Sequence, residues 1–247
     1  MNFLFRKPQP PVTQHFEVAT DRGPVSVSLR RDTRARNYTL RVKGAARQPV
    51  LTMPTRGSLR EARAFLDRHT GWLAREMARL PDVTPIVDGA VIPFRGIPHR
   101  IRHMAQTRGT VTAVDSGCGP ELVVAGGAEH IRRRVIDFLR REARRDLEAA
   151  VGRYAERLRV TPTAIRLRDT TSRWGSCAPS GELSFSWRLI LAPPFILDYL
   201  AAHEVTHLRE MNHSQRFWRL LDAVSPDTER ARRWLRREGA ALHAVGG

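Results

Sequence analysis

The stretch His203-Glu204-Val205-Thr206-His207, followed by Leu208-Arg209-Glu210-Met211-Asn212-His213, decides how this 247-residue chain is interpreted. It supplies three imidazoles and a neighbouring carboxylate within eleven positions. Histidines four residues apart on a helix lie on one face, about one turn apart, so both can bind one metal ion. The spacing therefore predicts a metal site carried by a helix.

The segment from Phe195 to about Met211 has the pattern of that helix. Two prolines stand at its start, where they suit a first turn, and apolar or small side chains recur along it. Asn212 tolerates the left-handed conformation that ends many helices. We expect Asn212 to end the helix and to turn the chain so that His213 comes back toward the metal.

These side chains match the needs of a hydrolytic zinc site. Bound zinc lowers the pKa of water from about 15.7 to about 7, and a carboxylate accepts the proton during attack. Glu204 lies one step round the helix from His203, where it can reach such a water. A bare HExxH match also arises by chance on a solvated helix. The third histidine, His213, strengthens the interpretation as a site with one zinc ion.

The composition indicates a cytoplasmic protein. The chain has two cysteines and no CxxC pair, so neither a disulfide framework nor a cysteine zinc site is supported. The N-terminal apolar run is too short for a signal peptide, and no stretch approaches the roughly 18 apolar residues of a membrane span. We therefore expect no membrane partner.

The positive charge lies mostly away from the histidines. The net charge is +17, and residues 1–160 hold 30 basic and 16 acidic residues, against 12 and 9 in residues 161–247. Between Arg22 and Arg47 there are eight basic residues and only Asp32 as an acid. Such a surface attracts polyanions, although a solvated basic surface is the simpler interpretation. Nucleic acid is thus a possible partner of the N-terminal region.

The hydrophobic patterns divide the chain into a β-rich N-terminal region, residues 1–126, and a metal-binding domain, residues 127–247. Alternating apolar residues predict strands, and apolar residues at helical spacing predict helices. No internal repeat is evident. The expected segments are strands from His15 to about Thr55, a helix over Ser58–Leu80, short strands over Pro81–Gly127 and a long helix over Glu129–Leu158.

A hairpin is predicted immediately before the metal helix. The turn Pro179-Ser180-Gly181 separates two runs of strand character, and the run Ile165–Asp169 forms a further short strand. A sheet edge beside a metal can accept an extended peptide as an added strand. This hairpin is where we expect the substrate groove.

Several linked motifs resemble the YgjP-like metallopeptidase family, which is related to the SprT and WLM zinc peptidases. The resemblance implies an α+β fold with a minimal zincin-like core, in which a small sheet packs on the HExxH helix. It also implies that His203, His207 and His213 bind zinc and that Glu204 is the general base. The motifs that carry it are Ser172-Arg173-Trp174-Gly175-Ser176-Cys177, Trp187–Pro193, Tyr199, His203-Glu204-x-x-His207 and Asn212-His213-Ser214-x-x-Phe217-Trp218.

Two further side chains are candidates for substrate binding. Arg173 could bind a carboxylate or phosphate, or could brace its loop through a partner acid. Tyr199 lies one turn before His203 on the same face and could reach the reaction centre or pack in the core. Cys177 fits a buried small side chain better than a ligand or nucleophile. The arginines of the last helix, which starts at Ser225-Pro226-Asp227, are expected to face solvent.

Three hypotheses of function follow. The first is a zinc-dependent metallopeptidase that acts on a protein or peptide substrate, with Glu204 as general base. The second is a metal-dependent phosphohydrolase of nucleotides or other phosphate esters, whose arginines bind the anion. The third is a basic nucleic-acid-associated protein with a structural metal. A protease that acts on DNA-bound proteins combines the first and third.

Overall fold

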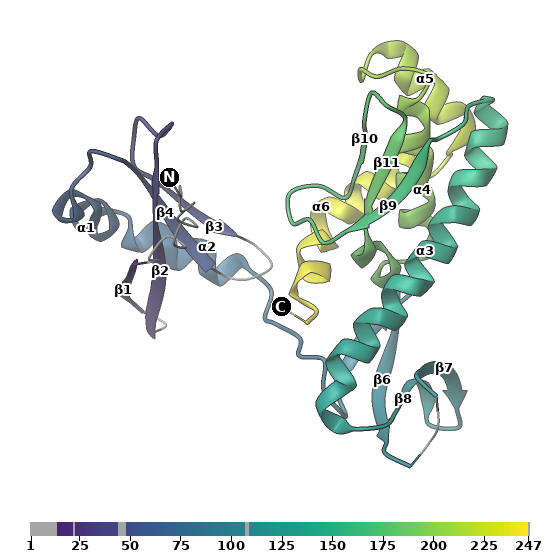
Figure 1. Ribbon diagram of the computed structural model, residues 1–247, viewed down its shortest axis with the longest axis horizontal. Coiled ribbons are helices and arrows are strands. Elements are labelled where there is room, and N and C mark those ends of the chain that lie inside the picture. Colours follow the sequence, from purple (N-terminus) through teal and green to yellow (C-terminus); the bar gives the residue numbers. More distant parts are fainter. Residues whose placement is uncertain (1–13, 22, 44–47, 107–108, 247) are drawn as a thin grey trace, which may run out of the picture. The chain divides into compact units, whose positions relative to one another are not determined.

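The computed structural model divides the chain into two compact units, Met1–Leu80 and Pro81–Gly247 (Figure 1). The α+β class is confirmed, since both units combine sheets with helices. The domain boundary predicted between residues 126 and 127 falls inside the second unit, between a strand and a helix that share one core. The structure describes residues 14–21, 23–106 except 44–47, and 109–246.

A four-stranded sheet in the order β1-β2-β4-β3 forms the centre of the first unit. β1 and β2 are antiparallel, β2 and β4 are parallel, and β3 and β4 are antiparallel. Alternate apolar side chains of the strands pack against two helices in one core. The elements are β1 (Gln14–Thr20), β2 (Gly23–Asp32), β3 (Thr39–Lys43), β4 (Gln48–Pro54), α1 (Leu59–Arg68) and α2 (Thr70–Arg79).

The segment predicted as one helix over Ser58–Leu80 is two. Ser58 starts α1 with a capping box, in which its side chain accepts from the Glu61 amide while the Glu61 carboxylate accepts from the Ser58 amide. The break falls at His69, whose Nδ1 lies 2.7 Å from the Phe65 carbonyl oxygen. Gly71 lies inside α2 and does not cause the break.

A second four-stranded sheet repeats the topology of the first. Its order is β5-β6-β8-β7, with the outer pairs antiparallel and the central pair parallel. The repeat was not evident in the sequence, because the same types of residue can form parallel and antiparallel strand pairs. The strands are β5 (Val91–Phe94), β6 (Ile97–Met104), β7 (Val111–Ser116) and β8 (Gly119–Ala125).

A long helix, α3 (Ile131–Leu158), connects this sheet with the metal-binding part of the same unit (Figure 1). A short 3₁₀ turn, η1 (Ala128–His130), precedes it. Its 28 residues span about 42 Å at 1.5 Å per residue. The predicted long helix is thus present, its apolar stripe is buried, and its other face carries charged residues. No helix in the described ranges is long and apolar enough to cross a membrane.

The predicted hairpin belongs to a three-stranded sheet in the order β10-β11-β9. β10 and β11 are antiparallel and joined at the expected turn, whereas β9 is parallel to β11. A 3₁₀ helix, η2, separates this hairpin from the metal helix, which was expected to follow directly. The elements are β9 (Ala164–Arg168), β10 (Gly175–Cys177), β11 (Glu182–Ser186), η2 (Trp187–Leu191), α4 (Pro194–His207), α5 (Gln215–Val224) and α6 (Thr228–Ala244).

The turn between β5 and β6 supports the start of α4. The Arg95 amide donates to the Ile190 carbonyl at 2.7 Å, and the Gly96 amide donates to the Leu191 carbonyl at 3.1 Å. Gly96 has φ +77°, and a Cβ there would lie 2.8 Å from Pro193 Cα. Glycine is required at this close approach. The second sheet therefore fixes the position from which the metal helix starts.

Candidate metal centre and its groove

The metal helix α4 ends at His207, four residues before the predicted end. The amides of Arg209 and Glu210 both donate to the Thr206 carbonyl, which tightens the last turn. The predicted left-handed turn at Asn212 is wrong: in the described part of the chain, only Arg95 and Arg159 are non-glycine residues with positive φ. Successive tight hydrogen-bonded turns reverse the chain instead.

Three imidazoles converge at the end of α4. One nitrogen from each of His203, His207 and His213 lies within 4.8 Å of the other two. The Nε2 atoms of His203 and His213 are 3.1 Å apart. Tetrahedral ligands about 2.05 Å from zinc stand about 3.3 Å from one another. The donor set thus fits one zinc ion, and no fourth His, Cys, Asp or Glu of the described ranges joins the group.

Burial favours the neutral, metal-binding form of two of the imidazoles, His203 and His207. Burial, together with the charges of His207 and His213, lowers the pKa of His203 to about 3. Burial also lowers the pKa of His207. The His207 Nδ1 lies 3.1 Å from the Glu210 carbonyl oxygen, to which it donates as N–H. This hydrogen bond leaves the His207 Nε2 lone pair for a cation.

Phe217 forms the floor under the three histidines. Its ring centroid lies 5.0, 4.5 and 4.8 Å from those of His203, His207 and His213, and the residue has no exposed surface. Ser214 caps α5 by accepting from the Phe217 amide, which sets the start of the helix that carries this ring. The buried Phe217 ring therefore helps to fix the orientation of the imidazoles.

Glu204 lies buried against the backbone of β10, with 4% of its surface exposed. Burial raises the pKa of its carboxyl group to about 8, against an opposing effect of the Arg173 charge. A Cβ at Gly175 would lie 2.5 Å from Glu204 Oε1. Only glycine allows the Glu204 carboxyl group to approach the strand so closely. A glycine inside a strand is the sequence signal that could have indicated this close approach.

A groove of about 280 Å³ brings Glu204 and His203 together with residues of β10 and α6. Tyr199 lines it but is buried, with its ring 5.8 Å from that of His203, so it packs beside the histidine. The expectation that the arginines of the last helix face solvent is incomplete, because two of them line the groove. The lining residues are Trp174, Gly175, Tyr199, Leu200, His203, Glu204, Arg232, Leu235 and Arg236.

The remaining candidates lie beside this groove. Arg173 is exposed and lines an adjoining pocket of about 210 Å³. Cys177 is half-buried, and burial together with the charge of Glu204 raises the pKa of its thiol to about 11. Its thiol is therefore protonated at neutral pH and is a poor ligand or nucleophile. This agrees with the prediction of a small packed side chain.

The chain belongs to the YgjP-like metallopeptidase domain family, whose model matches residues 36–238. This membership places it among the hydrolases. No curated protein matches it. Among solved structures it is similar to the metallopeptidase zymogen of Pyrococcus abyssi abylysin, at 22% identity and a TM-score of 0.34, over 39% of this chain and 94% of that chain.

Proposed function

We propose that the protein is a zinc-dependent metallopeptidase in which His203, His207 and His213 hold one zinc ion and Glu204 is the general base. The observation that carries the proposal is the convergence of three imidazoles, one of which, that of His203, lines the groove that also holds the Glu204 carboxyl group. Three ligands leave a tetrahedral ion one open position, as catalytic zinc sites require.

A zinc ion held there would polarise the scissile carbonyl and activate water. The Glu204 carboxylate accepts a proton from the attacking water and delivers it to the leaving amine. Burial in a low-dielectric wall makes this carboxylate more basic, which suits both transfers. Because residue 175 is glycine, β10 lies close to the Glu204 carboxylate, and a substrate bound along β10 comes within reach of that carboxylate.

An extended peptide can bind along β10. In the described sheet β10 pairs only with β11, so its other side is an edge. Peptides add to such edges as a further strand through main-chain hydrogen bonds. The edge lies next to α4, since Gly175 packs on Glu204. This arrangement supports the hairpin as the place where the substrate backbone is aligned.

The test is metal analysis combined with Glu204→Gln. The variant should keep zinc and lose at least about 100-fold in hydrolysis of a peptide panel, because proton transfer contributes 10²–10⁴-fold to such reactions. Glu210→Gln is the matched control, because it changes a carboxylate three residues after His207 that pairs with Arg216 and does not line the groove. Equal hydrolysis by Glu204→Gln and wild type, with zinc bound in both, would overturn the proposal.

A phosphohydrolase is the second candidate. The observation that favours it is the presence of Arg232 and Arg236 in the groove, since arginine binds phosphate oxygens in bidentate geometry. A nucleotide and phosphate-ester panel, run with the same variants, separates the two candidates. Hydrolysis of phosphate esters without hydrolysis of peptides would replace the first proposal by the second. The hypothesis of a structural metal is less well supported, because such sites have four protein ligands.

A further inference from the structure

We infer that the outer face of the β9–β11 sheet carries a subsite for an anionic side chain of the substrate, formed around Arg168 and Arg173. The inference rests on the proposed peptidase function and adds the substrate class. The pocket of about 210 Å³ adjoins the groove with Glu204 and shares Gly175 with it. Its lining contains two arginines, three hydroxyls and no acid: Arg168, Thr170, Arg173, Gly175, Ser176, Ser184 and Phe185.

Strand register places three of these side chains on one face of the sheet. Ser176 stands opposite Ser184, and Ser184 stands opposite Arg166, two residues before Arg168 on β9. Side chains directly opposite each other, or two residues apart on one strand, share a face. Gly175, the neighbour of Ser176, presents its other side to Glu204. The subsite and the general base therefore lie on opposite faces of β10.

The positive charges of the pocket favour an anionic ligand. Within the described ranges neither Arg168 nor Arg173 forms an ion pair, whereas the nearby Arg166 pairs with Glu182. Two guanidinium groups beside the hydroxyls of Ser176 and Ser184 supply the donors that a carboxylate or phosphate needs. The lining thus complements an anionic side chain, either the carboxylate of aspartate or glutamate or a phosphorylated hydroxyl.

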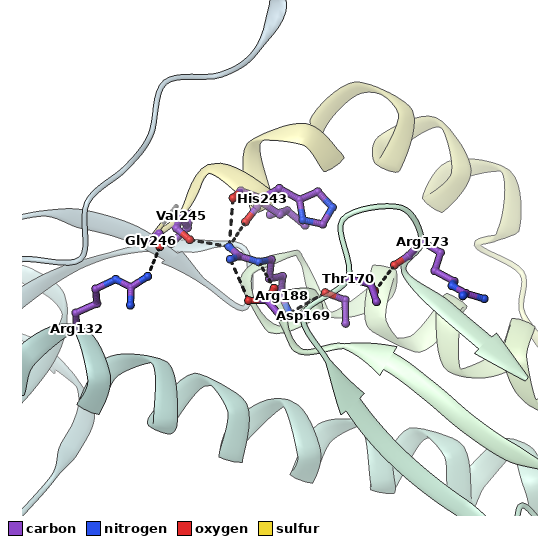
Figure 2. Close-up of polar contacts among 10 residues, drawn as sticks. Arg132, Asp169, Thr170, Arg173, Arg188, His243, Val245 and Gly246 are labelled. Carbon is purple, nitrogen blue, oxygen red and sulfur yellow. Dashed lines mark hydrogen bonds and ion pairs between the residues drawn. The ribbon is translucent and has the colours of Figure 1, made fainter. Parts of the chain in front are cut away.

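The loop that carries Arg173 is fixed before any ligand binds. The buried Arg188 forms an ion pair with Asp169 at 2.7 Å and donates to the Val245 carbonyl at 2.6 Å, which ties the loop to the end of α6 (Figure 2). The Thr170 hydroxyl donates to the Arg173 carbonyl at 2.9 Å. Figure 2 shows the Arg173 side chain extending away from this network. Its guanidinium is therefore available to a ligand.

A peptide bound along β10 reaches both faces of the sheet. Successive side chains of an extended strand point to opposite faces. When the scissile residue lies on the face of Glu204, each neighbouring residue points to the face of Arg168 and Arg173. The subsite therefore selects substrates with an anionic residue next to the residue at the cleavage point.

The experiment measures peptide binding to the zinc-loaded Glu204→Gln protein, which keeps the groove while cleavage is disabled. Extended peptide pools carry glutamate, glutamine, serine or phosphoserine at one fixed position, and fluorescence anisotropy gives the dissociation constants. We expect a preference of about tenfold for the glutamate or phosphoserine pool over its neutral counterpart, as charged hydrogen bonds supply. The pool that binds more tightly identifies the source of the anion.

Arg173→Gln and Arg168→Gln should each remove most of this preference. Arg166→Gln is the matched control, because it removes the same charge from β9 but from a residue already paired with Glu182. Thermal unfolding checks that all three variants stay folded. An equal loss in Arg166→Gln and Arg173→Gln would assign the preference to general surface charge and overturn the inference. The absence of any preference in the parent protein would do the same.

Hydrolysis by the wild-type protein separates this inference from the proposed function. Cleavage of neutral and anionic peptides at equal rates overturns the subsite and leaves the peptidase standing. Binding of anionic peptides that depends on Arg173, without cleavage of any peptide, supports the subsite and overturns the peptidase.

Discussion

The two four-stranded sheets share strand order and strand directions but differ in what their first hairpin turn contacts. In the first sheet the turn ends at Gly23, where φ is +109° and an added Cβ would meet no described atom within 4 Å. In the second sheet Gly96, one of the two residues of the corresponding turn, lies against Pro193, at the start of the metal helix. The same topology thus forms the core of one unit and, in the other, a support for the candidate metal centre.

Metal removal should give the largest difference between the units. A ligand that binds only the folded state stabilises it by about 4 kcal/mol at a thousandfold excess over its Kd. We expect chelation to speed amide exchange in α4 and β10 of the second unit and to leave β2 and β4 of the first unchanged. Hydrogen exchange with mass spectrometry measures both. An equal response of the two units would contradict the assignment of the metal to the second.

Substitution of the two turn glycines should give the next largest effect. Gly96→Ala and Gly23→Ala both place a Cβ at positive φ, which costs about 1–2 kcal/mol. Gly96→Ala adds overlap with the Pro193 backbone, and we expect about 3 kcal/mol in total. Urea unfolding measures both variants, and zinc titration should show weaker binding only for Gly96→Ala. Equal destabilisation would show that the second turn does not support α4.

Loss of an ion pair should destabilise the second unit more than the first. Arg95 is partly buried and pairs with Asp146 at 2.7 Å and Glu142 at 2.9 Å, and these carboxylates together raise its pKa. We expect Arg95→Gln to cost about 2 kcal/mol, because it removes the partly buried cation and leaves Glu142 and Asp146 with the exposed Arg145 alone. Arg30→Gln, at the exposed pair with Asp32, should leave unfolding unchanged. A measurable loss of unfolding free energy in Arg30→Gln, with none in Arg95→Gln, would reverse the comparison.

The smallest effect concerns nucleic acid, which we expect to bind the first sheet rather than the second. Of the basic residues on which this expectation rests, Arg22 and Arg47 lie outside the described residues, while Arg36 and Arg41 are exposed. Each removed phosphate contact should lower the slope of log K against log salt by about 1. Arg36→Gln and Arg41→Gln should show this in DNA titrations. An equal decrease of this slope in Arg100→Gln, a variant of β6, would indicate that the overall charge of the protein attracts the DNA.

The candidate site could be predicted from the sequence because its geometry is local. The spacing of His203 and His207 fixes their relation once a helix forms, and Ser214 marks the next helix by its capping chemistry. The hairpin was predictable for the same reason, since Pro179-Ser180-Gly181 is a turn signal. Each of these inferences needed only a few consecutive residues.

The rest depends on contacts between distant residues. The parallel pairs β2–β4 and β6–β8 are decided by packing, so the repeated topology could not be predicted from alternation. The end of α4 at His207 depends on backbone hydrogen bonds that Asn212 does not control. The role of Gly175 appears only when Glu204 lies against it. The pattern of residue types along the chain does not indicate which distant residues come into close contact.

X-ray absorption at the zinc edge of the purified, zinc-loaded protein tests the central claim most directly. The account predicts one zinc per chain with three imidazole nitrogens at about 2.0–2.1 Å and one light-atom ligand from solvent. In the His213→Ala variant one imidazole contribution should disappear. Coordination by sulfur from Cys177, a fourth protein ligand, or a spectrum unchanged by His213→Ala would contradict the three-histidine centre.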